Sequence, residues 1–552
     1  MNLKYKRPSI KKDIDAYKTL LKELKNSKTK KEQLTIIEQI NKIRDNFFSM
    51  YWLSYINYLL DVESEYWNKE ENFYAKYDPV MDNLKLKYYE ILNNSKFKEE
   101  LKKEIGTKVF KIADYETRLI NDEIFADLTK EKELSNSYTK LLSSAKVIFN
   151  NEEIPLSKLS KHLSSLDRDT RIKASAVRYE YFNSIKNKLD DILDDLIKVR
   201  TTIAKKLGFS SFTEVGYIKM KRLDYGKKEI KVFRENIIND IVPLVTKLKE
   251  AQRKELGLDK LMYYDDAVLF KDGNAIPKGD TKWIVKQATK MYRQISTEIS
   301  DTFNKMNNEG LMDLAARKNK KAGGITTYIP NYKVPVIISS LTNTSYDIKL
   351  LTHEFGHSFQ LYSSRNLKYY ENWWPTFDSC EIHSSSMELL TMPYMELFFG
   401  EEKDKYKKEI IHSFLIYLCY AALVDEFQHV LYDEPNLSKI ERKKRWRDLE
   451  KIYMPWLNYD GNKYLIEGNM WHKQSHIFQN PFYFIDYALA YTVSLQLYSL
   501  SLNKQEEAWS KYIELCKQGG AYSFIESLEK NNLISPFKKD ALKSIIENID
   551  IN

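Results

Sequence analysis

Two histidines and a glutamate within five residues are the strongest chemical signal in the sequence. In the segment LLTHEFGHSFQ, His353 and His357 lie four positions apart. On a helix their imidazoles would leave the same face about one turn apart, where they can bind one metal ion. Glu354 can reach a water molecule on that metal, remove its proton and pass the proton on. The pattern predicts a metal-dependent hydrolytic site with Glu354 as general base; the alternative is an ordinary helix carrying two unrelated histidines.

A catalytic zinc site needs a third protein ligand, and the sequence excludes two common ways of supplying it. The extended HExxHxxGxxH pattern fails, because Ser363 stands where its last histidine would be and Gln360 replaces its glycine. The short-spaced glutamate of thermolysin-like enzymes is also missing, since Thr376 and Phe377 occupy its expected positions. Three glutamates remain as candidates for the third ligand: Glu371, Glu381 and Glu388.

Glu381 and Glu388 lie seven positions apart on a second predicted helix, hence on one face of it. One could bind the metal while the other orients His353 or His357 through its free ring nitrogen. Glu381 follows His357 by 24 positions, which is enough for a loop and a returning helix. Two imidazoles and a carboxylate favour zinc, although cobalt or manganese could replace it. Weaker candidates for a ligand or supporting role flank Glu381: Asp378, Cys380 and His383.

A second group of polar aromatic residues lies in NMWHKQSHIFQNPFYFIDYALAYTVSLQL, near the C-terminus. It contains His472, His476, Tyr483, Tyr487 and Tyr491. Peptide hydrolysis builds negative charge on the former carbonyl oxygen, and neutral phenols or an imidazole could stabilise that charge together with the metal. The alternative is a core aromatic stripe, since the chain has 39 tyrosines and most of them must be structural.

Long amphipathic helices must position these groups, because only 16 glycines and 13 prolines interrupt 552 residues. Apolar residues recur at helical spacing over residues 8–189, which predicts a mostly α protein. Residues 320–341 instead alternate β-branched and aromatic residues with polar ones and predict a small hairpin with an edge strand. Pro330 and Pro335 suit a turn or an edge rather than a central strand. The following NTSYD offers N-caps for the histidine-bearing helix, which we expect to begin near Ile348.

Composition and charge argue against several other classes of protein. The net charge of +9 arises from 87 basic and 78 acidic residues with interleaved signs, which is typical of a solvated helical surface rather than a nucleic-acid-binding one. Three scattered cysteines indicate a reducing compartment and no disulfide framework. The N-terminal segment lacks a signal-peptide core, and the apolar run 410–424 is short for a membrane span. We therefore expect a cytoplasmic protein with no membrane or nucleic-acid partner, and 410–424 as a buried core helix.

Four segments resemble, in order, the thimet oligopeptidase and oligoendopeptidase F family of zinc metallopeptidases, in particular its oligoendopeptidase F-like branch. They are MDLAARKNKKAGGITTYIP, THEFGHSFQ, EIHSSSME and HIFQNPFYFIDYALA, within a resemblance that spans residues 190–545. The resemblance implies that His353, His357 and Glu381 are the zinc ligands. It further implies that Glu354 is the general base and that Glu388 is a supporting acid.

The same resemblance implies that His476, Tyr483 and Tyr487 contact the substrate and the oxyanion. It also implies a mostly helical, two-lobed metallopeptidase fold around a deep channel with the metal at its floor. A small antiparallel β element would lie beside the active site and pair with the extended substrate backbone. We expect a helical N-terminal region over residues 1–190 and a zinc metallopeptidase catalytic region over residues 191–552.

The sequence thus predicts an endopeptidase with one zinc ion, acting on short unstructured peptides. A carboxypeptidase or dipeptidyl carboxypeptidase on the same scaffold is an alternative, which would need a cationic pocket for the substrate's C-terminal carboxylate; Arg365 could contribute to it. A second alternative is a non-catalytic helical protein that binds peptides. Glu354 argues against it, and so does a set of only three convincing ligands, because structural zinc sites are normally closed by four.

Overall fold

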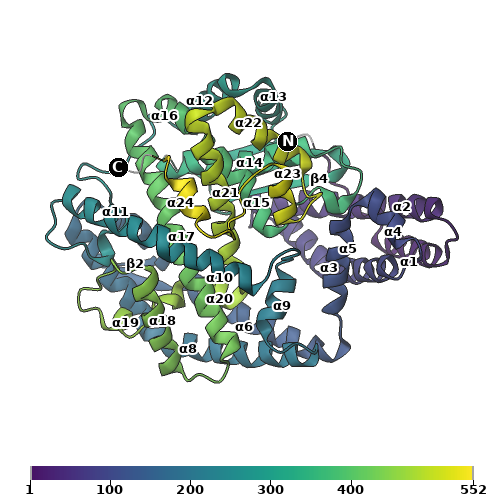
Figure 1. The fold of residues 1–552 in the computed structure, drawn as a ribbon, viewed down its shortest axis with the longest axis horizontal. Coiled ribbons are helices and arrows are strands. Elements are labelled where there is room, and N and C mark those ends of the chain that lie inside the picture. Colours follow the sequence, from purple (N-terminus) through teal and green to yellow (C-terminus); the bar gives the residue numbers. More distant parts are fainter. Residues whose placement is uncertain (1–2, 343, 550–552) are drawn as a thin grey trace.

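The computed structural model describes residues 3–342 and 344–549 and confirms the predicted mostly α fold (Figure 1). Helices of up to 39 residues carry most of the chain, and the strands form one two-stranded and one three-stranded sheet. The long helices follow from the scarcity of glycine and proline in the sequence.

The first five helices pack together and project to one side of the body (Figure 1). α2 begins at a capping box in which Thr29 and Glu32 satisfy each other's backbone N–H groups. Its apolar face, which includes Ile37, Ile40 and Phe47, is fully buried among its neighbours. The helices of this bundle are α1 (Ile10–Asn26), α2 (Lys30–Leu60), α3 (Glu65–Asn93), α4 (Lys98–Ile105) and α5 (Thr107–Arg118).

A second set of helices continues the chain to residue 308. Its longest member, α8, runs without a break through residue 190. The predicted division between residues 190 and 191 therefore falls inside a helix, and it stays a prediction. The helices of this part are α6 (Phe125–Ser143), α7 (Ser160–Leu163), α8 (Arg168–Lys206), α9 (Phe212–Lys219), α10 (Lys227–Asn236), α11 (Val242–Glu255), α12 (Thr281–Ile295) and α13 (Thr297–Asn308).

A short hairpin interrupts the region that the sequence predicts to be helical throughout. Strands β1 (Lys146–Phe149) and β2 (Glu152–Pro155) pair antiparallel across Asn150 and Asn151, both of which have positive φ angles. Asparagine tolerates this left-handed conformation, which two-residue hairpin turns require. The sequence analysis did not predict this hairpin, because four-residue strands are too short to give a clear period-two pattern.

The sheet beside the histidine-bearing helix has the strand order β3, β5, β4. The antiparallel pair β4 (Gly324–Ile329) and β5 (Val334–Leu341) confirms the predicted hairpin, and β3 (Met312–Ala315) adds a parallel strand that the sequence did not predict. Pro330 lies in the turn as expected, whereas Pro335 lies in the central strand, which corrects its prediction. Pro335 is tolerated there because β3 pairs with β5 only from Ile337 onward, so Pro335 has a neighbouring strand on one side alone.

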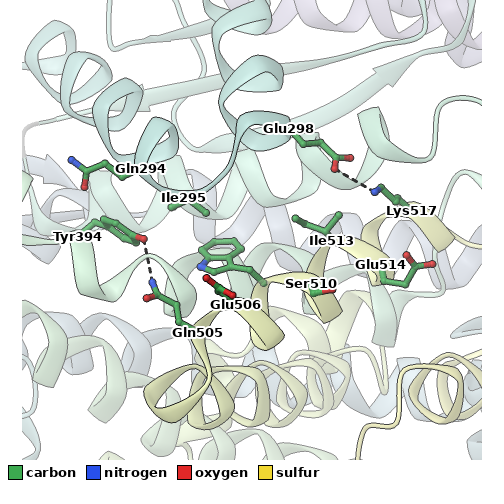
Figure 2. Close-up of a pocket in the computed structure, with 11 residues that line it drawn as sticks. Gln294, Ile295, Glu298, Tyr394, Gln505, Glu506, Ser510, Ile513, Glu514 and Lys517 are labelled. Atoms are coloured by element: carbon green, nitrogen blue, oxygen red, sulfur yellow. Dashed lines mark hydrogen bonds and ion pairs between the residues drawn. The ribbon is translucent and has the colours of Figure 1, made fainter.

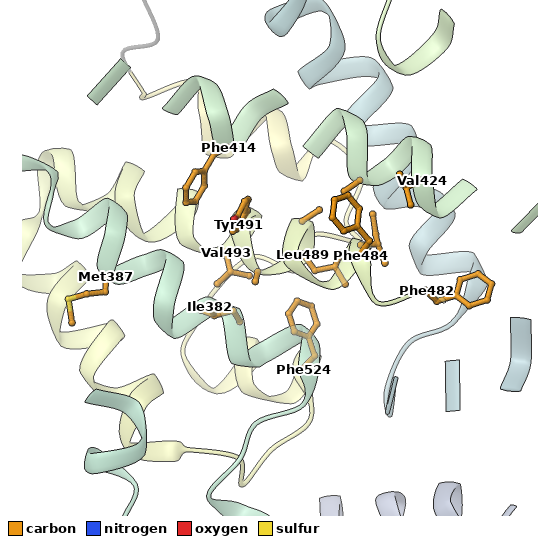
Figure 3. Packing of buried hydrophobic residues seen from close by; sticks show 14 of the residues in the cluster. Ile382, Met387, Phe414, Val424, Phe482, Phe484, Leu489, Tyr491, Val493 and Phe524 are labelled. Atoms are coloured by element: carbon orange, nitrogen blue, oxygen red, sulfur yellow. The ribbon is translucent and has the colours of Figure 1, made fainter. Parts of the chain in front are cut away.

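The C-terminal half of the chain surrounds a dense apolar core. Figure 3 shows Ile382 of α15, Phe414 of α17 and Val493 of α21 within it, and all three are nearly inaccessible to solvent. α21 can approach α15 closely because small residues face each other there: the Ser385 and Ser494 hydroxyls are 2.8 Å apart. The helices of this half are α14 (Ser345–Ser363), α15 (Phe377–Leu390), α16 (Glu396–Phe399), α17 (Lys403–Asp433), α18 (Lys439–Tyr453), α19 (Lys463–Ile466), α20 (Ser475–Gln479), α21 (Phe484–Asn503), α22 (Gln505–Gln518), α23 (Phe524–Lys530) and α24 (Ala541–Ile546).

One helical stretch of the described chain, Glu396–Asp433, is long and apolar enough to cross a membrane by length and composition. Within the protein, 67% of its apolar window is buried, and α17 packs against α21 and α18. Such burial is also what the core helix of a globular protein shows, and it agrees with the prediction of a core helix over 410–424.

Candidate active site

The helix that carries the two histidines is fixed at its N-terminus by an aspartate. The Asp347 carboxylate accepts the backbone N–H groups of Thr342 and Thr344, at 2.8 and 3.3 Å. α14 therefore begins at Ser345, three residues before the predicted start near Ile348. Asn343, one of the candidate caps, lies outside the described residues.

His353, His357 and Glu381 come together as the sequence predicts. The Glu381 Oε2 atom lies 3.3 Å from His353 Nε2 and 3.4 Å from His357 Nε2. The ligand atoms of the three side chains lie within 4.8 Å of one another, and within residues 3–342 and 344–549 no other such group of histidine, cysteine or acidic side chains is found. This donor set and spacing fit one metal ion with a position left open for water or substrate.

A glycine allows the two ligand-bearing helices to approach this closely. A Cβ atom on Gly356 would lie 2.5 Å from the carbonyl oxygen of His383 and 2.7 Å from the Cα atom of Ser384. Both are backbone atoms of α15, which cannot rotate out of the way. Gly356, which directly precedes His357, therefore determines the distance between α14 and Glu381.

The remaining ring nitrogens of the two histidines have different partners. His353 Nδ1 lies 2.7 Å from Glu388 Oε1, so Glu388 supports His353, one of the two options that the sequence left open. His357 Nδ1 instead lies 3.9 Å from the Cys380 sulfur. The sequence analysis gave Cys380 only as a weaker candidate and did not predict this contact with His357. Both contacts leave the Nε2 atoms directed at Glu381.

The electrostatics of the group favour a bound cation. Burial alone would lower the pKa of His353, but hydrogen bonds to Glu381 and Glu388 outweigh this effect and raise it to about 9. Burial also opposes ionisation of Glu381, yet the two histidines hold the pKa of its carboxyl well below the usual range. The carboxylates thus favour positive charge at the point where the Nε2 atoms converge. A metal ion can supply that charge in place of protons.

Glu354 lies beside the ligands and contacts the edge strand of the sheet. Its Oε2 atom accepts a hydrogen bond of 2.6 Å from the hydroxyl of Thr326 on β4. A Cβ atom on Gly324 would lie 2.9 Å from Glu354 Oε1, so a larger residue at this position would displace the carboxylate. Thr326 is a functional candidate that the sequence analysis missed, because nothing in a strand pattern indicates which residue will face a distant helix.

His476, Tyr483 and Tyr487, the three predicted substrate-contacting residues, form one cluster. The ring centroids lie 5.7 Å apart for His476 and Tyr483 and 5.1 Å apart for the two tyrosines. All three side chains are partly exposed, whereas Phe482 and Phe484 beside them are buried. The cluster therefore presents polar groups to an accessible space rather than to the core.

Electrostatic coupling connects the two phenols with the metal group. Burial, the neighbouring phenol Tyr487 and the charge of Glu381 together raise the pKa of Tyr483 above its usual value. Burial and Glu381 act in the same direction on the pKa of Tyr487. Phe377, at the start of α15, packs against Tyr483 with ring centroids 5.3 Å apart. Both phenols are therefore neutral hydrogen-bond donors close to the predicted ligands.

His476 is also held as a neutral donor. The Gln474 side-chain amide donates to its Nδ1 atom over 2.8 Å, which places the ring proton on Nε2. Burial lowers the pKa of His476 to about 4, so the ring stays uncharged near neutral pH. A neutral imidazole with a free Nε2–H can donate to a developing oxyanion.

The other candidates have structural partners. His472 has Asp190 at 3.0 Å on one ring nitrogen and Tyr464 at 2.8 Å on the other. Tyr491 stacks on Phe414 in the core, with ring centroids 4.1 Å apart (Figure 3). Each follows the structural alternative that the sequence analysis weighed.

The remaining acidic candidates and His383 likewise have hydrogen-bond or ion-pair partners outside the metal group. Glu371 forms a buried ion pair with Arg44 at 2.6 Å, and Asp378 accepts from Tyr225 at 2.7 Å. His383 Nδ1 lies 3.3 Å from the Cys380 carbonyl oxygen, and His383 does not belong to the group of converging ligand atoms. Of the three glutamates considered as third ligand, Glu381 is the one that converges with both histidines.

A surface hollow elsewhere on the protein has no part in this constellation. It measures about 550 Å³ and lies between α12, α13 and α22, lined by residues such as Glu298, Gln505 and Lys517 (Figure 2). Glu298 and Lys517 neutralise each other across it at 3.3 Å. None of the predicted site residues lines this hollow.

Solved structures similar to this chain cover nearly its whole length. PZ peptidase A, solved with an inhibitor, is 42% identical, has a TM-score of 0.91, and matches over 99% of this chain and 97% of its own. A Bacillus anthracis strain Ames protein described as a candidate oligoendopeptidase F is 41% identical, with a TM-score of 0.86 and coverage of 99% and 96%.

Sequence relatives point to the same group. An oligoendopeptidase F homolog from Borreliella burgdorferi is 23% identical over 426 residues, which cover 72% of this chain and 69% of that protein. The oligopeptidase PepF of Bacillus subtilis is 23% identical over 422 residues, which cover 72% of this chain and 60% of that protein.

Two known protein-family domains match most of the sequence. Peptidase family M3 matches residues 161–546, and the peptidase M3 N-terminal domain matches residues 1–120. The first match contains every residue of the metal group and of the C-terminal cluster. The chain therefore belongs to the metallopeptidase family M3, in its oligoendopeptidase F branch, and is a peptidase.

Proposed function

We propose that the protein is a zinc-dependent endopeptidase that hydrolyses short, unstructured oligopeptides in the cytoplasm. The observation that carries the proposal is the convergence of His353 Nε2, His357 Nε2 and Glu381 Oε2, with Glu354 on the next helical position. Three protein ligands with an open position are the usual arrangement of a catalytic zinc site.

Proton transfer is the task of Glu354 in this mechanism. When zinc is bound by the three ligands, it supplies an acidified water and polarises the scissile carbonyl. Glu354 takes up the proton of the attacking water and then delivers it to the leaving amine. The Thr326 hydroxyl, 2.6 Å from Glu354 Oε2, keeps one carboxylate oxygen oriented while the other is free to accept the proton.

Charge on the former carbonyl oxygen is stabilised by the C-terminal cluster. His476 Nε2–H and the phenol groups of Tyr483 and Tyr487 are neutral donors in a partly exposed cluster. Donors that are oriented before the reaction lower the transition-state energy more than they strengthen substrate binding.

The edge strand β4 provides a place for the substrate backbone. Among the described residues β4 pairs only with β5, so its other edge is free for an extended peptide. Main-chain pairing is tolerant of side chains, which suits a peptidase with broad specificity. The same strand carries Thr326, so a bound peptide would lie beside Glu354.

The cytoplasmic location rests on the thiols and on the sequence. Cys419 and Cys516 are buried and Cys380 is partly exposed, and all three are free. A reducing compartment keeps such thiols unmodified. We propose peptides as the only class of partner, with neither nucleic acid nor membrane.

Cleavage of an internally quenched peptide, blocked at both ends, tests the proposal. The parent and the Glu354→Gln variant are compared at equal bound zinc. Cleavage at an internal bond by the parent alone supports the endopeptidase mechanism with Glu354 as its base. If neither protein cleaves although zinc is bound, the endopeptidase proposal is wrong, and exopeptidase activity is then tested with peptides that have free ends.

A further inference from the structure

We propose that a pocket beside the C-terminal cluster binds a carboxylate group of the peptide substrate, with Arg178 and Lys473 as its specificity-determining cations. We call it the Arg178–Lys473 pocket. The inference rests on the proposed peptidase function and concerns which peptides that site prefers. Peptides with an acidic side chain or a free C-terminus at the matching distance are the ligands that its chemistry fits.

The pocket is a defined hollow with aromatic walls. Its volume is about 180 Å³, compared with about 30 Å³ for one water molecule, so a carboxylate-bearing side chain can enter. Tyr179 of α8, Tyr263 and Tyr459 contribute to the walls. Arg178 lines it from α8, and Lys473 lines it from the 3₁₀ turn Met470–Lys473, which ends three residues before His476.

The two cations lack ionic partners, in contrast to the cations around them. In the part of the chain that the structure describes, neither Arg178 nor Lys473 forms an ion pair, and Lys473 makes only an aromatic contact, 5.5 Å from the Tyr420 ring centroid. Lys443 pairs with Asp190 at 2.6 Å. A half-buried charge that lacks a partner is costly, and a ligand carboxylate would relieve that cost.

The single acid of the pocket is already neutralised. Asp266 is its only acidic lining residue, and Lys249 binds it at 2.9 Å. Burial lowers the pKa of Lys473 to about 8, and the nearby charge of Arg178 acts in the same direction. The hollow therefore has an excess of positive charge, and an anion that enters it would be attracted by both side chains.

A short series of ring contacts connects the pocket with the substrate-binding cluster. Tyr420, next to Lys473, lies 5.7 Å from the ring of Phe484, and Phe484 lies 4.9 Å from the ring of His476. The Tyr420 hydroxyl is buried and has no hydrogen-bond partner within the described residues. Lys473 precedes His476 by three residues, and a chain spans at most about 3.6 Å per residue, so the Cα atoms of these two residues are no more than about 11 Å apart.

A peptide series distinguishes the two sources of the carboxylate. One arm replaces glutamine by glutamate at each position in turn in a peptide blocked at both ends. The other arm compares a free C-terminal acid with its amide. For each pair, kcat/KM is measured with the parent enzyme, and the dissociation constant is measured by fluorescence anisotropy with Glu354→Gln, which does not depend on cleavage.

We expect one arm to show an acid preference of about tenfold or more, since a hydrogen-bonded charge pair in a partly desolvated site contributes at least that factor. Lys473→Met keeps the length and packing of the side chain, and it should lower the acid-to-amide ratio; Lys473→Met combined with Arg178→Met should reduce the ratio to about one. Lys473→Arg should retain the preference. Lys463→Met, which removes the same charge from an exposed position, should leave the ratio unchanged.

Failure of this inference differs from failure of the proposed function. Cleavage by the parent with no acid preference at any position, or a preference that is unchanged in Lys473→Met or survives in the double variant, overturns the pocket and leaves the peptidase proposal intact. If no peptide is cleaved, but Glu354→Gln binds acids more tightly and the double variant in the same background does not, the pocket stands and the endopeptidase proposal fails.

Discussion

Replacing Gly356 by alanine should separate metal binding from folding. The added Cβ would lie 2.5 Å from the His383 carbonyl oxygen and 2.7 Å from Ser384 Cα, whereas ordinary contact begins at 3.4 Å. α15 must therefore move away from α14 by up to about 1 Å, since both obstacles are backbone atoms in a close-packed interior. Overpacking of this kind costs about 1–3 kcal/mol of folding free energy.

The same displacement should also weaken metal binding. Glu381 moves with α15 while His353 and His357 stay on α14, and metal–ligand distances tolerate changes of only about 0.2 Å. We expect zinc affinity to fall by at least about tenfold, in the range seen when ligand support is lost. Competition with a zinc chelator measures the affinity, and thermal unfolding of the metal-free protein measures the folding cost separately.

Gly226→Ala is the matched control for this experiment. Its Cβ would meet nothing closer than a Glu229 carboxylate oxygen at 3.6 Å, and its backbone has a negative φ. It should bind zinc as the parent does. If Gly356→Ala also binds zinc as tightly as the parent, the contact between the helices does not position Glu381, and the reasoning is refuted.

Glu388→Gln should weaken zinc binding about 10- to 100-fold, because a neutral amide replaces the carboxylate that orients His353 over 2.7 Å; an unchanged affinity in chelator competition would contradict this role. Thr326→Val should lower kcat about tenfold with little change in KM, since it removes the hydroxyl that orients Glu354, and Thr326→Ser should retain the parent rate in steady-state kinetics. Burial raises the pKa of Glu409 from 4.5 to about 7, so the folded protein keeps a proton that the unfolded chain loses. The resulting stabilisation, at most about 3 kcal/mol, is complete below pH 4.5 and is lost as the pH rises to about 7. Glu409→Gln should flatten that decrease in denaturant unfolding curves, and equal slopes for both proteins would show that Glu409 is not the cause.

The metal ligands are predictable from sequence to different degrees. The His353 and His357 pair follows from helical periodicity alone, because four positions place both rings on one face. Helical periodicity does not identify Glu381 as the third ligand, since Glu371 and Glu388 carry the same carboxylate group. Only the resemblance to a family distinguishes Glu381 from these two glutamates. In the structure, Glu381 Oε2 is the carboxylate oxygen of these three glutamates that approaches both Nε2 atoms, which favours Glu381.

Residues that act through tertiary contacts were not predictable in this way. Thr326 meets Glu354 across 28 positions of sequence, and Cys380 meets His357 across 23. Neither contact follows from a local pattern, because each depends on how a strand or a helix packs against α14. The hairpin at Asn150 and Asn151 was missed for the opposite reason. The residues that indicate it are adjacent in sequence, but a two-residue turn between four-residue strands is easily overlooked.

α15 connects all parts of the site except the general base. It carries Glu381, approaches α14 at Gly356, and packs against α21 through the serine contact that includes Ser494. Tyr487 lies on α21, so a displacement of α15 should alter the metal ligands and the oxyanion donors together. Glu354 is instead oriented by Thr326 on β4, which belongs to a different layer. Changes in β4 should therefore lower kcat and leave zinc affinity unchanged. Changes at the contacts of α15 should lower both kcat and zinc affinity. Measuring zinc affinity and kcat in the Thr326→Val and Gly356→Ala variants tests this difference.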